Sequence, residues 1–388
     1  MTENNNILVF SLAYQPYIGG AEIALQEIAT RLAEYRFDII TARFDKKNLK
    51  QEARGQIRVF RVGWGVWLDK YLFFILAYFK AKELHKKNNY KIVWGMMENY
   101  AGLAALLFKK KYKIKYLLTL QSGDSDKFIK KRTWFWQPLY RQIYTRADKI
   151  QAISKWLERR AKNYGYRGEI ALVPNGVEFG MFDQKINQEE RKNLLNQLSL
   201  KPDDKIIITI SRLVEKNGIG DLIEAMKYLD DRYKLLIIGE GKLERELKLK
   251  TEDFQSKADT PLAEKLSNRV KFLGQIDNDE LYKYLSIADV FIRPSITEGF
   301  GIAFLEAMAA SVPVIATNVG GIKDFLFDNE TGLVCQVNNP QSIAEQVKKL
   351  EDEQLRIKII TQALAKAREY DWNEIVKKMR VVFEDLIC

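Results

Sequence analysis

Residues 295–309 read Ser295-Ile296-Thr297-Glu298-Gly299-Phe300-Gly301-Ile302-Ala303-Phe304-Leu305-Glu306-Ala307-Met308-Ala309. The preceding residues, 288–294, form a short apolar run typical of a buried strand, and the apolar residues from 300 onward recur at helical spacing. The sequence therefore predicts a strand-to-helix turn at residues 298–301. Free N–H groups and the positive end of the helix dipole meet at a helix N-terminus, so such a turn can bind an anion.

Two carboxylates frame this turn, Glu298 at its mouth and Glu306 about two helical turns further on. Acids beside an anion site are unfavourable unless they bind neutral hydroxyl groups. A phosphate flanked by hydroxyl-rich groups describes a nucleotide-sugar, which is therefore the expected ligand of this segment.

The pattern Glu298-x7-Glu306 resembles the E-x7-E signature of retaining GT-B glycosyltransferases of family 4, the mannosyltransferase-like glycosyl transferases group 1. The resemblance implies that Glu298 contacts the donor sugar and that Glu306 holds the ribose hydroxyls. It also implies that the amides of Gly299, Phe300 and Gly301 contact the sugar and the diphosphate.

A second segment follows the predicted strand 205–210 and reads Ser211-Arg212-Leu213-Val214-Glu215-Lys216-Asn217-Gly218. Arg212 and Lys216 come just after a parallel strand and can converge on one anion. In the resembled family this segment, Ser211 included, binds the donor, and its Arg and Lys neutralise the diphosphate. The family's Gly-x-Gly at the next strand end matches residues 239–241, so Gly241 is a further donor-binding candidate.

The chain length of 388 residues suits two domains, and 47% hydrophobic with 29% charged residues describes a globular protein. The first residues show no basic and apolar leader pattern, and two cysteines, Cys335 and Cys388, fit a reducing cytoplasm. Residues 1–185 hold 33 basic and 17 acidic side chains, whereas residues 186–388 hold 29 and 34. The first half is therefore expected to seek an anionic partner: a membrane surface, a phospholipid acceptor or nucleic acid.

The first predicted strand, 7–14, is followed by Gly19 and Gly20 and then a helix. A glycine pair there lets the backbone approach a phosphate. It resembles the family's N-terminal Gly-Gly loop, which faces the donor diphosphate. The segment is not the G-x-G-x-x-G of dinucleotide sites, and no acidic residue ends the second strand, 37–42.

Acceptor or sugar contacts are expected where two further strands of the first half end. Glu98 follows the strand 91–95, and Gln121 and Asp124 follow the strand 116–120. Many family members carry a histidine where this chain has Gln121, so a histidine-dependent step is not expected. Asp124-Ser125-Asp126 also matches the D-x-D pattern of metal-dependent GT-A transferases and remains a rival hypothesis.

Two aromatic segments admit two interpretations. The apolar run 71–79 is too short to span a bilayer, because a spanning helix needs ~20 residues. It either packs in the core or lies in a membrane interface beside lysines, and its apolar residues on all sides favour the core. Residues 134–138, Trp-Phe-Trp-Gln-Pro, suit stacking on bases or a lipid interface, but a mainly buried core helix is favoured. The lysine cluster 109–115 is either a solubilising loop or a contact with anionic lipid.

Taken together, these segments predict an α/β chain of GT-B type, with two Rossmann-like domains whose parallel sheets face a central cleft. The domains are expected at 1–185, completed by a C-terminal helix at 372–388, and at 186–371, with a turn at 174–177 closing the first. The resemblance implies retaining, metal-independent transfer of a hexose from a GDP- or UDP-sugar to a hydroxyl of a glycan or lipid-linked acceptor. It places the chain in cell-envelope polysaccharide biosynthesis, in the cytoplasm or at the inner face of the membrane, without a cofactor.

Two other functions are weighed against this one. A nucleotide-sugar epimerase or a phosphorylase would keep the GT-B fold and change the chemistry. A nucleic-acid-binding protein would use the basic first half, but its basic residues are scattered over predicted helices without an RNA-binding or helix-turn-helix signature.

Overall fold

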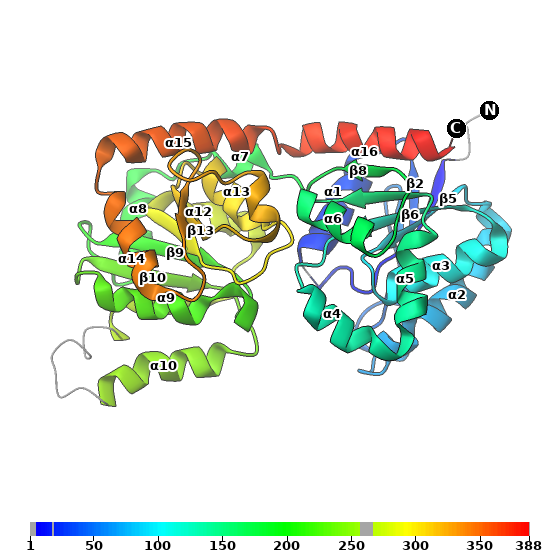
Figure 1. The fold of residues 1–388 in the computed structure, drawn as a ribbon, viewed down its shortest axis with the longest axis horizontal. Helices are drawn as coiled ribbons and strands as arrows, with labels where there is room; N and C mark the ends of the chain where they lie inside the picture. The colour runs from blue at the N-terminus through cyan, green and yellow to red at the C-terminus, as the bar shows by residue number, and fades with distance from the viewer. Residues whose placement is uncertain (1–4, 18, 257–266, 388) are drawn as a thin grey trace. The chain divides into compact units, whose positions relative to one another are not determined.

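The computed structural model describes residues 5–17, 19–256 and 267–387, with the side chains of 253–256 left aside. Met1 and Cys388, on which the leader and cysteine expectations partly rest, lie outside the described residues. The chain forms two compact units (Figure 1). Unit 1 comprises Met1–Gly176 and Trp372–Cys388, and unit 2 comprises Val177–Asp371.

Unit 1 is built on an eight-stranded sheet with the order β3-β4-β2-β1-β5-β6-β7-β8 within the described residues, parallel except for the edge strand β3. Its strands are β1 Asn6–Phe10, β2 Arg36–Ala42, β3 Gln51–Arg54, β4 Ile57–Val62, β5 Ile92–Met96, β6 Lys115–Leu120, β7 Lys149–Ala152 and β8 Ile170–Leu172. Its helices are α1 Gly20–Arg31, α2 Asp69–Asn88, α3 Tyr100–Tyr112, α4 Asp126–Thr133, η1 Trp134–Trp136, α5 Gln137–Thr145, α6 Lys155–Asn163 and α16 Trp372–Ile387.

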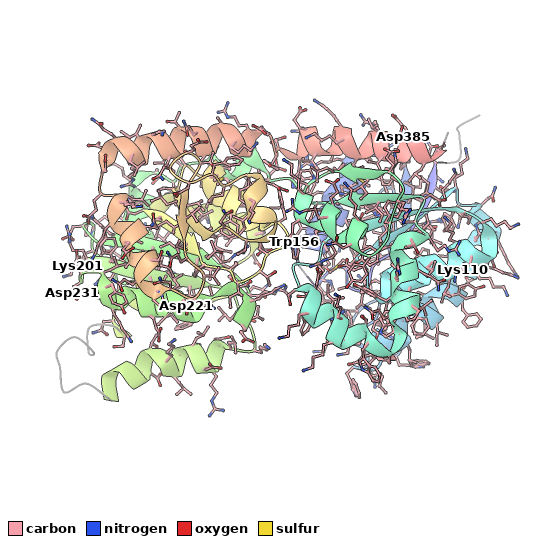
Figure 2. The ribbon with its side chains drawn as sticks, in the orientation of Figure 1. Lys110, Trp156, Lys201, Asp221, Asp231 and Asp385 are labelled. Atoms are coloured by element: carbon pink, nitrogen blue, oxygen red, sulfur yellow. The ribbon has the colours of Figure 1, made fainter. Side chains whose placement is uncertain are left out.

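The C-terminal helix α16 belongs to the core of unit 1. Its residues Trp372, Met379 and Phe383 are buried in one cluster with apolar residues of β1, β2 and β5. At its far end Asp385, labelled in Figure 2, accepts a hydrogen bond of 2.8 Å from the ammonium of Lys149 on β7. The last helix therefore completes a domain that begins some 370 residues earlier in the chain.

Unit 2 is built on a parallel six-stranded sheet with the order β11-β10-β9-β12-β13-β14 among the residues described. Its strands are β9 Lys205–Ile210, β10 Tyr233–Ile238, β11 Val270–Gly274, β12 Val290–Arg293, β13 Val314–Thr317 and β14 Leu333–Cys335. Its helices are α7 Phe179–Phe182, α8 Gln188–Gln197, η2 Glu215–Asn217, α9 Ile219–Ala225, η3 Met226–Tyr228, α10 Glu244–Ser256, η4 Asn278–Glu280, α12 Leu281–Ile287, α13 Ile302–Ala309, η5 Gly320–Asp324, α14 Pro340–Lys349 and α15 Glu353–Arg368. The first strand of this unit, β9, lies between β10 and β12, so the strand order reverses beside it.

The boundary between the units lies after Gly176, whereas the sequence analysis placed it after residue 185. Residues 178–184, which the predicted boundary assigns to the first domain, carry the short helix α7, which packs against α13. Phe182 is buried, and the guanidinium of Arg368 lies 5.1 Å from the ring centre of Phe179. These contacts make the segment part of unit 2.

The expectation that the two aromatic segments are mainly buried is wrong for one face of each. On α2, Phe73 is buried, but Tyr71 and Phe79 are exposed. On η1, Trp134 and Phe135 are among the most exposed apolar residues described. No helix in the described part of the chain is both long and apolar enough to cross a bilayer.

Candidate functional site

The two segments that the sequence predicts to bind a donor meet at one edge of the unit 2 sheet. Residues 211–218 follow β9, residues 294–301 follow β12, and these two strands are paired in parallel. The Ile296 amide donates a hydrogen bond of 2.7 Å to the Lys216 carbonyl, which joins the segments directly. In open α/β sheets, ligands bind outside the carboxyl ends of the strands where the strand order reverses, which is this position.

Glu298 lies in this edge as an ion-paired carboxylate. Its Oε2 accepts a hydrogen bond of 2.6 Å from Nη2 of Arg293, the last residue of β12. Its Oε1 accepts from the amides of Gly299 at 2.9 Å and Phe300 at 3.4 Å. In this state Glu298 therefore holds two of the amides that the sequence assigns to the donor, and a bound ligand would compete for them.

The turn itself requires glycine at 301. Gly301 precedes α13 with φ of +88°, and a Cβ there would lie 2.6 Å from the Phe304 ring and 2.7 Å from Nη2 of Arg293. The amides at the start of a helix lack a partner in the preceding turn and can bind an anion, although in α13 the Phe304 amide donates a hydrogen bond of 3.2 Å to the Gly301 carbonyl. Phe300 contributes its backbone only, because its ring is buried against Phe325 and Tyr370.

Glu306 lies in α13 and is almost completely buried. Burial raises the pKa of its carboxyl to about 7, while the nearby charge of Arg293 acts in the opposite direction. Arg293 is itself buried, and burial lowers its pKa against the opposing charges of Glu298 and Glu306. One guanidinium therefore interacts with both acids of the E-x7-E pattern, by a hydrogen bond with Glu298 and through its charge with Glu306.

Arg212 and Lys216 lie on the loop after β9. Arg212 is exposed, and its charge contributes to lowering the pKa of Arg293, which places it near the two acids. Lys216 lies on η2 and is half-buried. The structure thus brings Arg212, Lys216 and Glu298 to the same sheet edge.

Ser211 and Gly241 shape this loop. The Ser211 hydroxyl donates to the Arg212 carbonyl at 3.0 Å and accepts from Nδ2 of Asn217 at 2.7 Å, so it is engaged within the protein. A Cβ at Gly241 would lie 2.4 Å from the Leu213 carbonyl oxygen. Both residues therefore hold the backbone around Arg212, whatever further contact they make with a donor.

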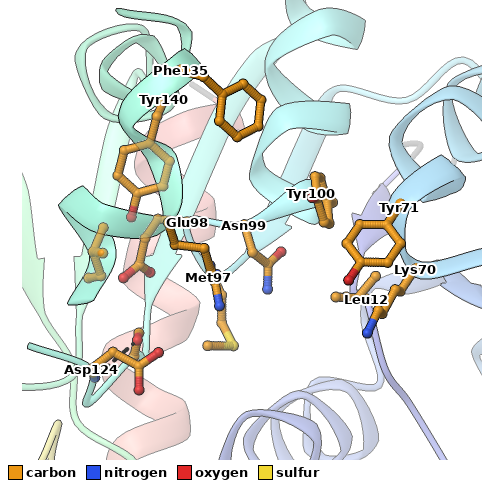
Figure 3. Close-up of a pocket in the computed structure, with 13 residues that line it drawn as sticks. Leu12, Lys70, Tyr71, Met97, Glu98, Asn99, Tyr100, Asp124, Phe135 and Tyr140 are labelled. Atoms are coloured by element: carbon orange, nitrogen blue, oxygen red, sulfur yellow. Dashed lines mark hydrogen bonds between the residues drawn. The ribbon is translucent and has the colours of Figure 1, made fainter. Parts of the chain in front are cut away.

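Unit 1 has a cavity of about 520 Å³ at the matching place in its own sheet (Figure 3). It lies beyond the ends of β1, β5 and β6, where the strand order of this unit reverses between β1 and β5. The lining residues are Leu12, Lys70, Tyr71, Met97, Glu98, Asn99, Tyr100, Ser122, Asp124, Ile129, Arg132, Phe135 and Tyr140. Two of the three predicted acceptor residues, Glu98 and Asp124, are among them.

The acids of this cavity are organised by Arg160, a buried residue of α6. Its guanidinium donates to Glu98 at 3.4 Å and to the Ser122 carbonyl at 2.9 Å, and it pairs with Asp126 at 3.0 Å. Glu98 is 3% exposed, and its Oε2 has no hydrogen-bond partner among the described residues. Burial raises the pKa of Glu98, and the charge of Arg160 opposes this effect.

The Arg160 guanidinium disfavours the hypothesis that Asp124 and Asp126 bind a metal ion. Asp126, the second acid of that pattern, faces Arg160, and the Asp124 carbonyl also accepts from it. A cation would have to bind beside this fixed positive charge, which is unfavourable. Within the described residues, no three His, Cys, Asp or Glu side chains come together as a metal site would require.

Gln121, the third predicted acceptor residue, does not line the cavity. Its side-chain amide exchanges two hydrogen bonds with that of Asn175, at 3.1 and 2.9 Å. Gly19 and Gly20 lie at the start of α1, also in unit 1. A Cβ at Gly20 would meet nothing within 4 Å, so the fold alone does not require glycine there.

Comparisons with known proteins identify the family of the chain. The family model described as "Glycosyl transferases group 1" matches residues 190–367, and the one described as "Glycosyltransferase Family 4" matches residues 18–179. The chain belongs to the family 4 glycosyltransferases of GT-B fold. An uncharacterized glycosyltransferase of Methanocaldococcus jannaschii is 27% identical to this transferase over 96% of each chain.

Two further proteins resemble the transferase over different extents. A GDP-mannose-dependent monoacylated alpha-(1-6)-phosphatidylinositol monomannoside mannosyltransferase of Corynebacterium glutamicum is 30% identical over 60% of each chain. The structure of a sucrose-phosphate synthase from Thermosynechococcus elongatus superposes with a TM-score of 0.84 at 22% identity, covering 98% of this chain and 99% of that one. This last similarity supports the fold.

Sequence reasoning about the transferase missed two central residues, Arg293 and Arg160. Each left a signal: Arg293 ends an otherwise apolar strand, and Arg160 lies in the buried register of α6 between Leu157 and Ala161. A charged residue in a buried position requires a partner. The partners themselves were unpredictable because Glu98 lies 62 residues from Arg160 in the sequence.

Proposed function

We propose that the transferase moves a hexose from a GDP- or UDP-sugar to a hydroxyl of a glycan or lipid-linked acceptor, with retention at the anomeric carbon and without a metal ion. The observation that carries the proposal is the gathering of Arg212, Lys216, Glu298 and Glu306 at one edge of the unit 2 sheet. Two cations suit a diphosphate, and two carboxylates suit the hydroxyls of the sugar and the ribose.

The leaving group of such a reaction is a nucleoside diphosphate, on which negative charge grows as the glycosidic bond breaks. Cations already in place stabilise that charge without reorganising at the moment of reaction. In this proposal Arg212 and Lys216 fill that role, together with backbone amides at the start of α13. Residues Gly19 and Gly20 would add backbone contacts to the diphosphate, which stays a prediction.

The arrangement of Glu298 favours departure and attack on the same face of the sugar. A carboxylate nucleophile needs a free oxygen directed at the anomeric carbon. Both oxygens of Glu298 are already held, one by Arg293 and one by backbone amides. It is therefore suited to accept hydrogen bonds from sugar hydroxyls and to orient the donor.

The relatives guide the choice of substrates to test. The similar protein of Corynebacterium glutamicum is named for GDP-mannose and for a phosphatidylinositol acceptor. By analogy we propose GDP-mannose as the first donor to test, a lipid-linked glycan as the first class of acceptor, and the inner face of the membrane as the place of action.

A thermal-shift screen against GDP-, UDP- and ADP-sugars, with and without EDTA, tests the donor and the metal together. We expect one nucleotide class to raise the melting temperature equally in both conditions, and NMR of the product to show the donor's anomeric configuration. A shift that EDTA abolishes would overturn the metal-independent mechanism. Conversion of the donor without acceptor would indicate an epimerase, and a requirement for phosphate would indicate a phosphorylase.

A further inference from the structure

Large apolar side chains are exposed on two segments of unit 1. The first is the loop before α2 with the outer face of that helix, and the second is α4 with η1. Trp67 is 68% exposed, Trp134 75% and Phe135 70%. Other exposed members are Trp64, Val66, Leu68, Tyr71, Leu72, Ile75, Phe79 and Phe128. Apolar surface of this extent on one domain marks an interaction site.

The first of these segments is held rigidly by Asp69, which is fully buried. Its Oδ2 accepts hydrogen bonds from the amides of Trp64 at 2.8 Å, Gly65 at 2.6 Å and Val66 at 2.9 Å. A Cβ at Gly63, whose φ is +112°, would lie 2.5 Å from the Asp69 carboxyl carbon. The loop is therefore built to present apolar side chains to its surroundings.

Both segments contribute side chains to the lining of the unit 1 cavity, Tyr71 from the first and Phe135 from the second. Tyr100, which lines the cavity, packs edge-on against Tyr71 of α2 and stacks against Trp136 of η1, each with ring centres 6.1 Å apart. Trp67 contacts Tyr71 at 5.8 Å, and Phe135 contacts Trp136 at 6.4 Å. The aromatic contacts thus run from one exposed segment to the other through Tyr100 of the cavity lining.

The lining of the cavity carries both basic and acidic side chains. Lys70 and Arg132 line the cavity. Burial raises the pKa of the Tyr100 phenol, and the charges of both basic residues oppose this rise. In the view of Figure 3 the acids Glu98 and Asp124 lie on the side away from Lys70, with Asn99 between. The exposed basic residues Lys127, Lys130, Lys131 and Arg132 of α4 show no ion pair in the described part of the chain.

We propose that unit 1 rests on an anionic bilayer and takes from it a lipid-linked acceptor whose phosphate binds at Lys70 and Arg132 while a headgroup hydroxyl reaches Glu98. The apolar part of the acceptor stays in the bilayer against the aromatic segments. This inference rests on the proposed function, since it names the acceptor of that reaction.

A bilayer explains the surface better than a nucleic acid does. The exposed aliphatic residues Leu68, Leu72 and Ile75 offer no flat face for stacking on a base, but they suit insertion among acyl chains. The carboxylate oxygen of Glu98 that lacks a partner among the described residues can accept a hydrogen bond from a sugar hydroxyl of a glycolipid headgroup.

Sedimentation with vesicles tests the docking surface. We expect the full chain to bind vesicles of phosphatidylcholine and phosphatidylglycerol at 1:1 more tightly than vesicles of phosphatidylcholine alone. Trp67→Ser with Trp134→Ser should weaken binding roughly tenfold or more, because burying a single large apolar side chain is worth about that much. The matched control Val381→Ser removes an exposed apolar residue of α16 and should change nothing. Equal binding by the double variant, or preferential binding of single-stranded RNA, would overturn the proposal.

Titration with decyl phosphate below its micellar concentration tests the headgroup site. Arg132→Ala should weaken binding roughly tenfold or more, since a hydrogen bond to a charged group is lost. Lys130→Ala, on the same helix but outside the cavity lining, should have little effect. Inorganic phosphate that binds as tightly as decyl phosphate, or equal affinities for both variants, would contradict a lipid acceptor. Both assays work without donor, so they fail independently of nucleotide-sugar binding by unit 2.

Discussion

The pairing of Arg293 with Glu298 can be measured by a double-mutant cycle. In this ion pair the two side chains are 8% and 17% exposed and their charged atoms are 2.6 Å apart. Replacement by Arg293→Met keeps the volume and removes the charge, which leaves Glu298 partly buried with its backbone amides alone. Breaking a buried pair costs about 3–5 kcal/mol.

Because Glu298 keeps its bond from the Gly299 amide, we expect a loss of about 2–3 kcal/mol for Arg293→Met. For a unit of this size such a loss lowers the melting temperature by roughly 4–12 °C. Glu298→Gln should cost much less in the Arg293→Met background than in the wild-type protein, giving a coupling of about 1.5–3 kcal/mol.

Differential scanning calorimetry of the four proteins measures this coupling. The pair Lys250–Glu224, at 3.0 Å but about a third exposed on each side, provides the matched control in the same unit. Its coupling should not exceed about 1 kcal/mol. If the Arg293–Glu298 coupling is no larger than that of the control, Arg293 does not hold Glu298 and the described geometry of the site is wrong.

Three further predictions concern the same edge of unit 2. Lys216→Ala and Glu298→Gln should each lower kcat by roughly 100-fold or more without unfolding the protein. Lys201→Ala, which replaces an exposed lysine of unit 2, should leave kcat unchanged. Initial rates measure these effects, and a near wild-type rate for Lys216→Ala would refute its electrostatic role. Burial raises the Glu306 pKa from 4.5 to about 7, so the folded protein retains a proton that the unfolded chain releases, and folding stability falls as pH rises through this range. Relative to Glu306→Gln, the wild-type protein should therefore lose about 3 kcal/mol between pH 4.5 and pH 7, measured by denaturant unfolding, and parallel pH curves would contradict this. Gly301→Ala should destabilise unit 2 by more than about 1 kcal/mol, because its φ is +88° and the added methyl meets Phe304, whereas Gly20→Ala should leave the melting temperature unchanged or slightly higher; equal melting curves for both would show that the turn is not constrained.

The sequence predicted the strands of both sheets where apolar runs are bounded by polar or glycine residues. The predicted strand 205–210 has the limits of β9, and the predicted strands 37–42, 91–95 and 116–120 agree with β2, β5 and β6 to within one residue at each end. It did not predict β3, Gln51–Arg54, whose four polar or small residues form an antiparallel edge and carry no apolar alternation. Strand order also lies beyond a single sequence, because it depends on which strands pair across long loops.

The donor segments were predictable as separate motifs, but their connections were not. Motif spacing indicated Glu298, Glu306, Arg212 and Lys216, while the guanidinium that interacts with both acids became apparent only with the pairing of β9 and β12. Burial of α2 was overestimated because a helix that is apolar on all sides gives no sequence signal for the side that is exposed.

A crystal structure with an intact nucleotide-sugar donor tests the central claim most directly. The account predicts the diphosphate within hydrogen-bonding distance of the side chains of Arg212 and Lys216, the sugar hydroxyls at Glu298 and the ribose hydroxyls at Glu306. A donor bound elsewhere on the chain, or bound at this edge with its diphosphate out of reach of both cations, would contradict it.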